Sequence, residues 1–313
     1  MITLLSVAQI LKEKDNIEIL THRYPDGDTL GSAYALCLML QSMGKNARVI
    51  TSGTPAKKYD FLKDSVKEQE FEREFVVSVD VASPTLLGDN QQEYEGIIDL
   101  CIDHHKINTL EAANKYVDAE SASASEIIFE LSKELSLDLT KEMASCIYTG
   151  VSTDTGCFRY SNTTPKTLQI AAELMKITPD CHKINTVMFE LKTKEKLALE
   201  RMVFDTLEYF CEGKCAVIFT TIEMQKKAGI SEGELEGLAS IPRQIEGVLL
   251  GITIKEKCDR VFTVSVRTNE GVDAAQFCAR FGGGGHSAAA GCTVEGTLEE
   301  VKEKLVKAAE DVL

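Results

Sequence analysis

Eight aspartate and histidine residues lie where a predicted strand or helix meets a loop. All can bind a divalent cation through a carboxylate oxygen or an imidazole nitrogen, and they are His22, Asp26, Asp28, Asp80, Asp103, His104, His105 and Asp154. Oxygen and nitrogen ligands without cysteine suit Mn²⁺ or Mg²⁺ better than structural zinc. We therefore expect two Mn²⁺ ions at this site, with Mg²⁺, Co²⁺ or iron as alternatives.

Two divalent cations follow from the charge of the cluster. Unit charges about 4 Å apart interact by about 4 kcal/mol at an effective dielectric of 20, so four crowded aspartates need neutralising. A pair of cations roughly 3.5 to 4 Å apart can activate water and stabilise charge on a phosphoryl group during in-line displacement. The cluster therefore predicts hydrolysis of phosphate esters. A single aspartate at a strand end would instead indicate a turn or a helix cap.

Near the C-terminus, four successive glycines, Gly282, Gly283, Gly284 and Gly285, precede His286 and the small residues SAAAG. A glycine run alone is typical of a flexible turn. Followed by a histidine, however, it would let backbone amides approach an anion closely, while His286 and Arg267 donate charge-assisted hydrogen bonds to phosphate. We expect a substrate-binding loop here.

The elements that must position the cluster alternate between helix and strand patterns. Apolar runs of strand length occur at 17–20, 46–52, 75–80 and 96–103, separated by helical or turn-rich sequence. This order predicts an α/β domain with a parallel sheet and flanking helices, whose strand carboxyl ends line the ligand crevice. Further helices are expected at 123–135 and 141–150, and Asp154 in the polar turn that follows.

The second half has a different pattern. A long charged helix at 194–211 suits a linker, and beyond it three β-rich segments, a helix, the glycine loop and a closing amphipathic helix predict a smaller α+β domain. At about 150 residues per domain, 313 residues suggest two domains. We expect a catalytic domain at 1–190, a helical linker at 191–212 and a substrate-binding domain at 213–313.

Composition narrows the function further. The net charge is −15, which disfavours long or duplex nucleic acid as a partner. The sequence has no apolar stretch of bilayer length and no basic leader with a cleavage site, so a cytoplasmic protein without membrane contact is expected. Its ten cysteines contain no CxxC pair, which favours reduced, buried thiols.

Four segments, HRYPDGDTLGS, VSVD, DHH and STDTG, in this order resemble the motifs of the DHH phosphoesterase superfamily. The tail, with SVRT and FGGGGHSAAAG, resembles the associated DHHA1 domain. A stand-alone chain with both domains is most similar to the NrnA-type nano-RNase family. That resemblance implies hydrolysis of very short single-stranded RNA to nucleoside monophosphates and of 3′-phosphoadenosine 5′-phosphate to AMP.

The resemblance also implies roles for individual residues. It places His22 and Asp26 on one Mn²⁺, Asp28, His104 and Asp154 on the other, and Asp80 as the bridge between them. His105 would contact phosphate or the leaving group, and Asp103 would accept a hydrogen bond from an imidazole N–H. Arg267, the four glycines and His286 would hold the nucleotide.

Other functions remain open at this point. The enzyme alternatives are a RecJ-like single-strand exonuclease, a phosphodiesterase for cyclic or linear dinucleotides, and a family II inorganic pyrophosphatase, which lacks a matching second domain. The non-enzyme alternative is a nucleotide sensor whose metals are only structural. Neither the direction of degradation nor the base preference is readable from the residues, and a homodimer is left open.

Overall fold

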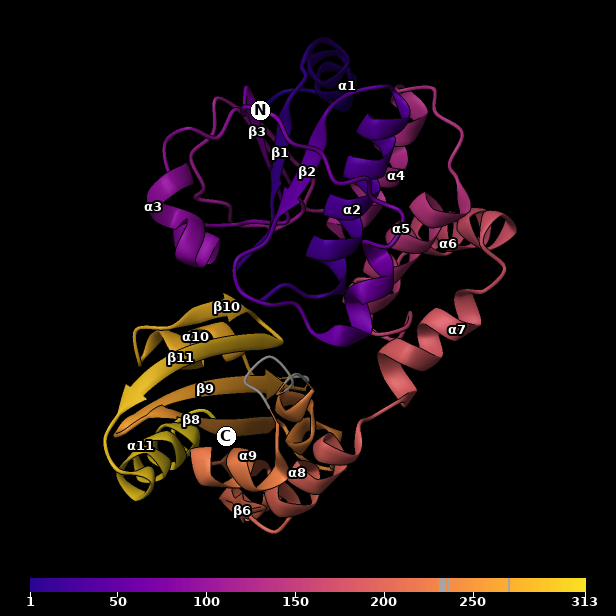
Figure 1. The fold of residues 1–313 in the computed structure, drawn as a ribbon. Coiled ribbons are helices and arrows are strands. Elements are labelled where there is room, and N and C mark those ends of the chain that lie inside the picture. Colours follow the sequence, from indigo (N-terminus) through magenta and orange to yellow (C-terminus); the bar gives the residue numbers. More distant parts are fainter. Residues whose placement is uncertain (231–234, 236, 270) are drawn as a thin grey trace. The chain divides into compact units, whose positions relative to one another are not determined.

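The structure is a computed structural model, and it describes residues 1–230, 235, 237–269 and 271–313. The chain divides into two compact units, Met1–Leu191 and Lys192–Leu313, whose elements are labelled in Figure 1. Within the described ranges, no helix is long and apolar enough to cross a membrane.

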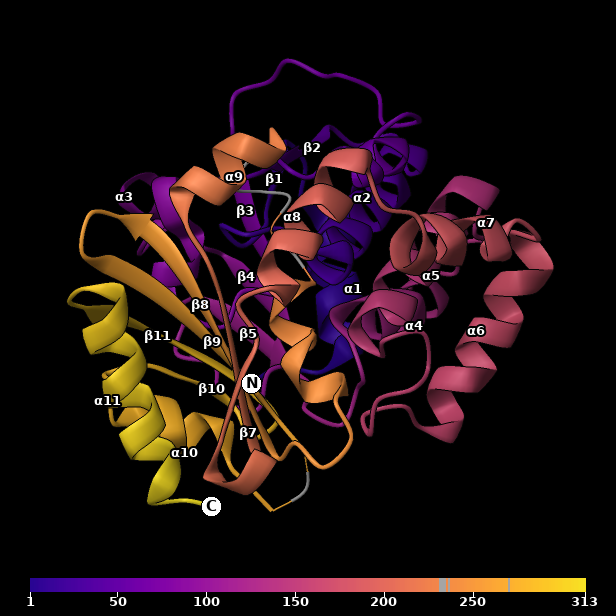
Figure 2. The same ribbon diagram turned by 90° about the horizontal axis from the view of Figure 1, so that it is seen from below.

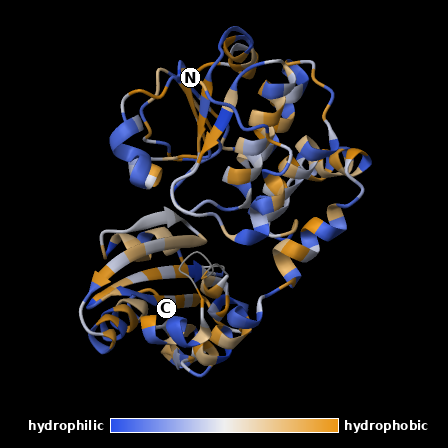
Figure 3. Cartoon of the chain, in the orientation of Figure 1, coloured by the Kyte–Doolittle hydropathy of each residue, from blue (hydrophilic) through white to orange (hydrophobic). Residues whose placement is uncertain are grey.

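The first unit contains a five-stranded, fully parallel sheet in the order β2-β1-β3-β4-β5. Its strands are β1 (Ile17–Leu20), β2 (Ala47–Ile50), β3 (Phe75–Val79), β4 (Leu100–Asp103) and β5 (Asn114–Val117). Every residue of β1, β3 and β4 is buried, which explains their continuous apolar sequence and the hydrophobic colour of these strands in Figure 3. The α/β class with a parallel sheet is confirmed.

Helices cover both faces of this sheet. They are α1 (Leu4–Glu13), α2 (Gly27–Ser42), α3 (Gln91–Tyr94), α4 (Ala124–Glu134), α5 (Lys141–Asp154), α6 (Pro165–Ile177) and α7 (Cys181–Asn185), with short turns η1 (Lys57–Leu62), η2 (Pro84–Asn90) and η3 (Thr186–Glu190). Ile17 and Ile19 of β1 pack with α1, α2, α4 and α5, whereas Leu20 packs on the other face with η2 and α3. Figure 1 shows α3 on the opposite side of the sheet from α2.

The central helix α2 crosses α5 closely because glycines stand at the crossing. A Cβ on Gly31 would lie 3.0 Å from the backbone nitrogen of Gly150, and a Cβ on Gly150 would lie 2.7 Å from Asp28 Oδ1. Both distances are shorter than side chains tolerate, so only glycine permits this approach. The close crossing brings the first turn of α2 next to the last turns of α5.

The second unit contains a six-stranded mixed sheet in the order β10-β11-β9-β8-β7-β6. Its strands are β6 (Glu208–Phe210), β7 (Cys215–Thr220), β8 (Leu250–Cys258), β9 (Val261–Thr268), β10 (Gly284–His286) and β11 (Ala289–Glu295). Among the described strand pairs of this second sheet, only β7–β8 is parallel. The expected α+β character of this part is confirmed.

Helices flank both faces of the second sheet as well. They are α8 (Lys194–Phe204), α9 (Ile222–Ala228), α10 (Ala274–Ala279) and α11 (Leu298–Glu310). Phe277 of α10 and Leu305 of α11 pack against one face, and Leu199 of α8 packs with Ile218 of β7 on the other. Figure 2 shows α11 and α8 on opposite sides of these strands.

Three local expectations from the sequence differ from the structure. The helix expected at 141–150 continues to Asp154, and the hydroxyls of Thr153 and Thr155 donate to carbonyls of the preceding turn. The helix expected at 194–211 ends at Phe204, since the chain turns there into β6, which pairs with β7. Residues 192–210 thus pack into the second unit.

The glycine run is the third difference. Instead of an irregular loop, Gly284–His286 form strand β10, which pairs with β11 in a hairpin. A Cβ on Gly283 would lie 2.5 Å from the Cβ of Cys292, so this glycine serves close strand packing rather than flexibility. Residues without side chains carry no alternation, which is why the sequence pattern did not predict a strand.

Candidate metal centre

The eight predicted Asp and His residues converge at one edge of the first sheet. His22 follows β1, Asp80 follows β3, and Asp103 ends β4 directly before His104 and His105. Asp26 caps the N-terminus of α2 and Asp28 lies in its first turn, while Asp154 is the last residue of α5. The carboxyl ends of parallel strands and two helix ends therefore meet at the place where such folds bind ligands.

These side chains form three overlapping groups of three, and Asp80 belongs to two of them, one of which also contains His104 and His105. The donor atoms of His22, Asp26 and Asp80 lie within 4.8 Å of one another, and so do those of Asp28, His104 and Asp154. Asp80 reaches toward both groups, with Oδ2 at 3.7 Å from His22 Nε2 and Oδ1 at 3.4 Å from His104 Nε2. The arrangement offers two adjacent cation sites with one carboxylate between them.

The environment of Asp80 fits a cation. The residue is only 3% exposed, and its Oδ1 accepts no well-aligned hydrogen bond. An unsatisfied buried carboxylate oxygen is costly unless a positive charge lies beside it. The backbone of Asp80 also adopts φ 60°, a left-handed conformation that non-glycine residues rarely take and that is concentrated at functional sites.

The protonation equilibria of the cluster indicate excess negative charge. Burial, together with the neighbouring charge of Asp80, raises the pKa of Asp28 to about 7. Desolvation and the charge of Asp28 likewise raise the pKa of Asp154 well above its usual range. Burial alone would lower the pKa of His22, but Asp26 and Asp80 raise it to about 9. A positive charge beside Asp28 and Asp154 would favour their ionised forms.

Backbone groups hold Asp28 in place. Its Oδ2 accepts a hydrogen bond from the N–H of Ala124 at 2.7 Å, and its Oδ1 accepts one from the N–H of Ser125 at 2.9 Å. Both donors belong to the first turn of α4, where the helix dipole also favours a negative charge. The carboxylate is therefore fixed before any cation binds.

Asp103 orients His105. Its Oδ1 lies 2.8 Å from His105 Nδ1 and also accepts the backbone N–H of His104, while its Oδ2 accepts a hydrogen bond from Asn108 Nδ2 at 2.6 Å. His104 instead has its Nδ1 3.3 Å from the carbonyl oxygen of Ser121. The imidazole that Asp103 faces is therefore that of His105, and its role as acceptor of an imidazole N–H stays a prediction.

Sequence reasoning missed Asn108, Ser121 and the amides of Ala124 and Ser125. Three of these contacts are made by backbone atoms, which every residue has, so the residue type does not indicate them. Asn108 follows Asp103 by five residues, and its side-chain amide could have been considered as the partner that a buried Asp needs. Among these four residues, Asn108 is the one whose residue type could have indicated its role.

In the second unit, Arg267 lies in β9, and its Nη1 donates a hydrogen bond to the carbonyl of Val266. Ala289 of β11 pairs with Arg267 on one side and with His286 on the other. The backbones of Arg267 and His286 are therefore two strand spacings apart, roughly 9.6 Å. The side chain of His286 lies outside the described part, and binding of substrate by this region stays a prediction.

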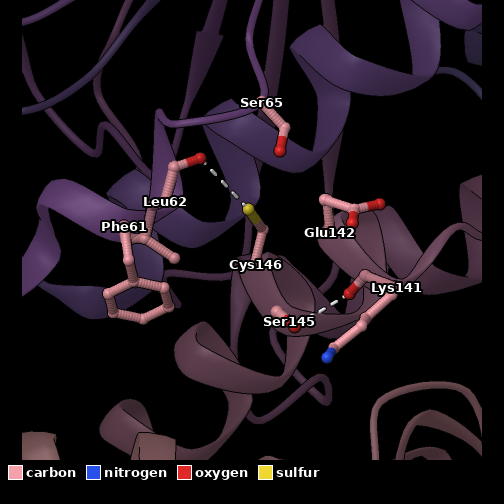
Figure 4. A pocket seen from close by; sticks show the side chains of 7 residues that line it. All are labelled: Phe61, Leu62, Ser65, Lys141, Glu142, Ser145 and Cys146. Carbon is pink, nitrogen blue, oxygen red and sulfur yellow. Dashed lines mark hydrogen bonds between the residues drawn. The ribbon is translucent and has the colours of Figure 1, made fainter.

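A cavity of about 110 Å³ lies elsewhere in the first unit, between η1 and the start of α5 (Figure 4). Its lining includes Leu62, Lys141, Ser145 and Cys146. The lining residues of α5 end at Cys146, so about 12 Å of helix lies between them and Asp154 in the metal-ligand cluster. This cavity does not belong to the candidate metal centre.

Comparisons with known proteins agree with this geometry. Residues 16–151 match the DHH family, N-terminal domain, and residues 213–313 match the DHHA1 domain. The bifunctional oligoribonuclease and PAP phosphatase NrnA of Thermus thermophilus is 30% identical, over 98% of this chain and 93% of that protein. The protein of the same name from Bacillus subtilis is 28% identical, with 90% of each chain covered.

Among solved structures, an exopolyphosphatase-related protein from Bacteroides fragilis superimposes with a TM-score of 0.88 at 25% identity, covering 98% of this chain and 96% of that one. Fold and site together define a phosphoesterase of the DHH family, a class of hydrolases. Within this class, the chain belongs to the NrnA family of proteins that combine a DHH and a DHHA1 domain.

Proposed function

We propose that this protein hydrolyses very short single-stranded oligoribonucleotides to nucleoside monophosphates and converts 3′-phosphoadenosine 5′-phosphate to AMP and phosphate. The observation that carries the proposal is the pair of Asp/His groups sharing Asp80 at the edge of the first sheet. The names of relatives that match nearly the full chain support the choice of substrates. The cytoplasm is the proposed location, and a homodimer is left open.

The first unit supplies the chemistry. His22 and Asp26 would hold one Mn²⁺, Asp28, His104 and Asp154 would hold the other, and Asp80 would contact both. When bound, such ions lower the pKa of water and stabilise charge on a phosphoryl group. The orphaned oxygen of Asp80 and the raised pKa values of Asp28 and Asp154 support two cations at this place.

His105 would act on the departing oxygen. Asp103 Oδ1 lies 2.8 Å from His105 Nδ1 and would accept a hydrogen bond from the Nδ1–H, which fixes the ring and leaves Nε2 as the atom that faces a second partner. A protonated His105 can then donate from Nε2 to the oxygen that leaves phosphorus. Asn108 keeps Asp103 in the orientation that this role needs.

The second unit would bind the nucleotide through Arg267, Gly282, Gly283, Gly284, Gly285 and His286. Gly282, Gly284 and Gly285 are exposed, so their backbone is accessible to an anion. Arg267 supplies a guanidinium that can bind phosphate in a bidentate manner. Recognition in this unit would therefore depend on backbone atoms and one cation.

A substrate series tests the proposal. The purified chain is given Mn²⁺ and 5′-labelled RNA or DNA of increasing length, with 3′-phosphoadenosine 5′-phosphate, cyclic dinucleotides and pyrophosphate in parallel, and Asp80→Ala as the control. Preference for RNA of two to five nucleotides supports the proposal. Processive degradation of long DNA would instead indicate a RecJ-like exonuclease, and inactivity on every ester with metal bound would indicate a sensor.

A further inference from the structure

The segment Ser121–Ser125, which leads from β5 into the first turn of α4, contacts the metal-ligand cluster through three backbone groups, and the side chain of Ser125 also lies close to Asp28. The carbonyl oxygen of Ser121 lies 3.3 Å from His104 Nδ1, and the amides of Ala124 and Ser125 donate to the two carboxylate oxygens of Asp28. The segment therefore positions two of the three ligands in the group of Asp28, His104 and Asp154. We call it the backbone bracket.

Asn162 connects this bracket to the third ligand. Its Nδ2 donates one hydrogen bond to the carbonyl of Ala122 at 3.0 Å and another to the carbonyl of Asp154 at 3.2 Å. An amide NH₂ group has two hydrogens, so both bonds can form together. The three positive φ angles at Gly156, Cys157 and Phe158 turn the chain after Asp154. Asn162 lies just beyond that turn.

The other group of ligands has different support. Asp26 Oδ1 accepts the N–H groups of Asp28 and Thr29 within its own helix cap, and Thr29 Oγ1 donates to the carbonyl of Val79, next to Asp80. In the described part of the chain, no hydrogen bond joins His22, Asp26 or Asp80 to the bracket or to Asn162. Among the described residues, the bracket and Asn162 thus support the group of Asp28, His104 and Asp154, while Asp80 and the hydrogen bond from the Asp28 N–H to Asp26 Oδ1 join the two groups.

We infer that Asn162 is a positioning residue for the cation site of Asp28, His104 and Asp154, and that the site of His22 and Asp26 does not depend on it. By holding Ala122 against Asp154, its amide keeps the bracket and the end of α5 at the spacing that the three ligands require. The inference rests on the proposed function, because it takes both groups as cation sites. It adds a residue that contacts neither substrate nor metal.

Mn²⁺ titration by calorimetry, with free Mn²⁺ followed by electron paramagnetic resonance, tests this without substrate. The wild-type chain should bind two equivalents. Asn162→Ala should weaken one of them at least about tenfold and leave the other unchanged, as substitutions behind metal ligands do. Asn162→Asp, which keeps the size but removes both donors, should weaken the same equivalent. Activity lost in either variant should recover as Mn²⁺ is raised.

Variants that already lack one cation site show which of the two bound Mn²⁺ ions depends on Asn162. In His22→Ala, adding Asn162→Ala should weaken the remaining Mn²⁺, whereas in Asp154→Ala it should change nothing. Ser161→Ala, at the exposed neighbouring position, is the matched control, and thermal melting verifies that each variant folds. Equal weakening of both equivalents, or of neither, would overturn the inference while the proposed function stands. A wild-type chain that binds no Mn²⁺ would instead overturn the proposed function.

Discussion

The edge of the first sheet and the glycine hairpin of the second unit differ in the atoms that they present. At the first edge, side chains such as Asp28, Asp80 and Asp103 are buried and oriented by neighbouring groups. In the hairpin, the glycines present backbone and are largely exposed. We infer that bond breaking depends on fixed side chains of the first unit, while recognition depends on accessible backbone and one cation of the second.

Replacing Asp80 should have the largest effect, because both groups of ligands share it. Asp80→Ala removes the carboxylate between His22 and His104, and we expect kcat to fall by about 10³-fold or more, since two-metal stabilisation amounts to several kcal/mol. Steady-state hydrolysis of a dinucleotide measures this. Hydrolysis at near wild-type rates by a folded Asp80→Ala chain would remove the basis for assigning chemistry to this edge.

The substitution His105→Gln tests the role of an oriented imidazole at the same edge. Glutamine keeps polarity but cannot carry a proton to a leaving oxygen, so kcat should fall by about 10²-fold. Mn²⁺ stoichiometry should stay at two, which separates this variant from loss of a metal ligand. A fall in metal binding equal to the fall in rate would show that His105 holds metal instead.

For the hairpin, the comparison predicts an effect on binding rather than on the chemical step. Arg267→Ala should raise KM by about 10-fold or more with little change in kcat, because a charge-assisted hydrogen bond contributes roughly 1.5–3 kcal/mol. Arg260→Ala, which breaks only a surface ion pair with Glu300, is the control and should leave both constants unchanged. A lower kcat in Arg267→Ala with an unchanged KM would contradict the assignment of chemistry to the first unit and of recognition to the second.

The smallest predicted effect concerns packing. Gly150→Ala introduces a Cβ against Asp28 and Ser125, so the free energy of unfolding should fall by about 1–3 kcal/mol and Mn²⁺ affinity should fall with it. Gly284→Ala in β10 meets no atom within 4 Å and should leave the unfolding free energy nearly unchanged. Urea unfolding of both variants measures the contrast, and equal losses would contradict it.

The sequence predicted the parallel sheet and the Asp/His residues at its edge because buried strands and strand-end ligands both leave strong patterns. Asp80, His104 and His105 each follow an apolar run, so their convergence could be expected from topology alone. The backbone contacts of Ser121, Ala124 and Ser125 were not predictable, since any residue carries these atoms, whereas Asn108 could have been considered as a partner of the buried Asp103. The strand β10 was missed because glycines have no side chains to alternate.

Anomalous diffraction from crystals grown with Mn²⁺ tests the central claim most directly. Data collected at the manganese edge should show two peaks roughly 3.5 to 4 Å apart, with Asp80 between them, His22 and Asp26 beside one, and Asp28, His104 and Asp154 beside the other. A single peak, or peaks remote from Asp80, would contradict a dinuclear centre at the edge of the first sheet.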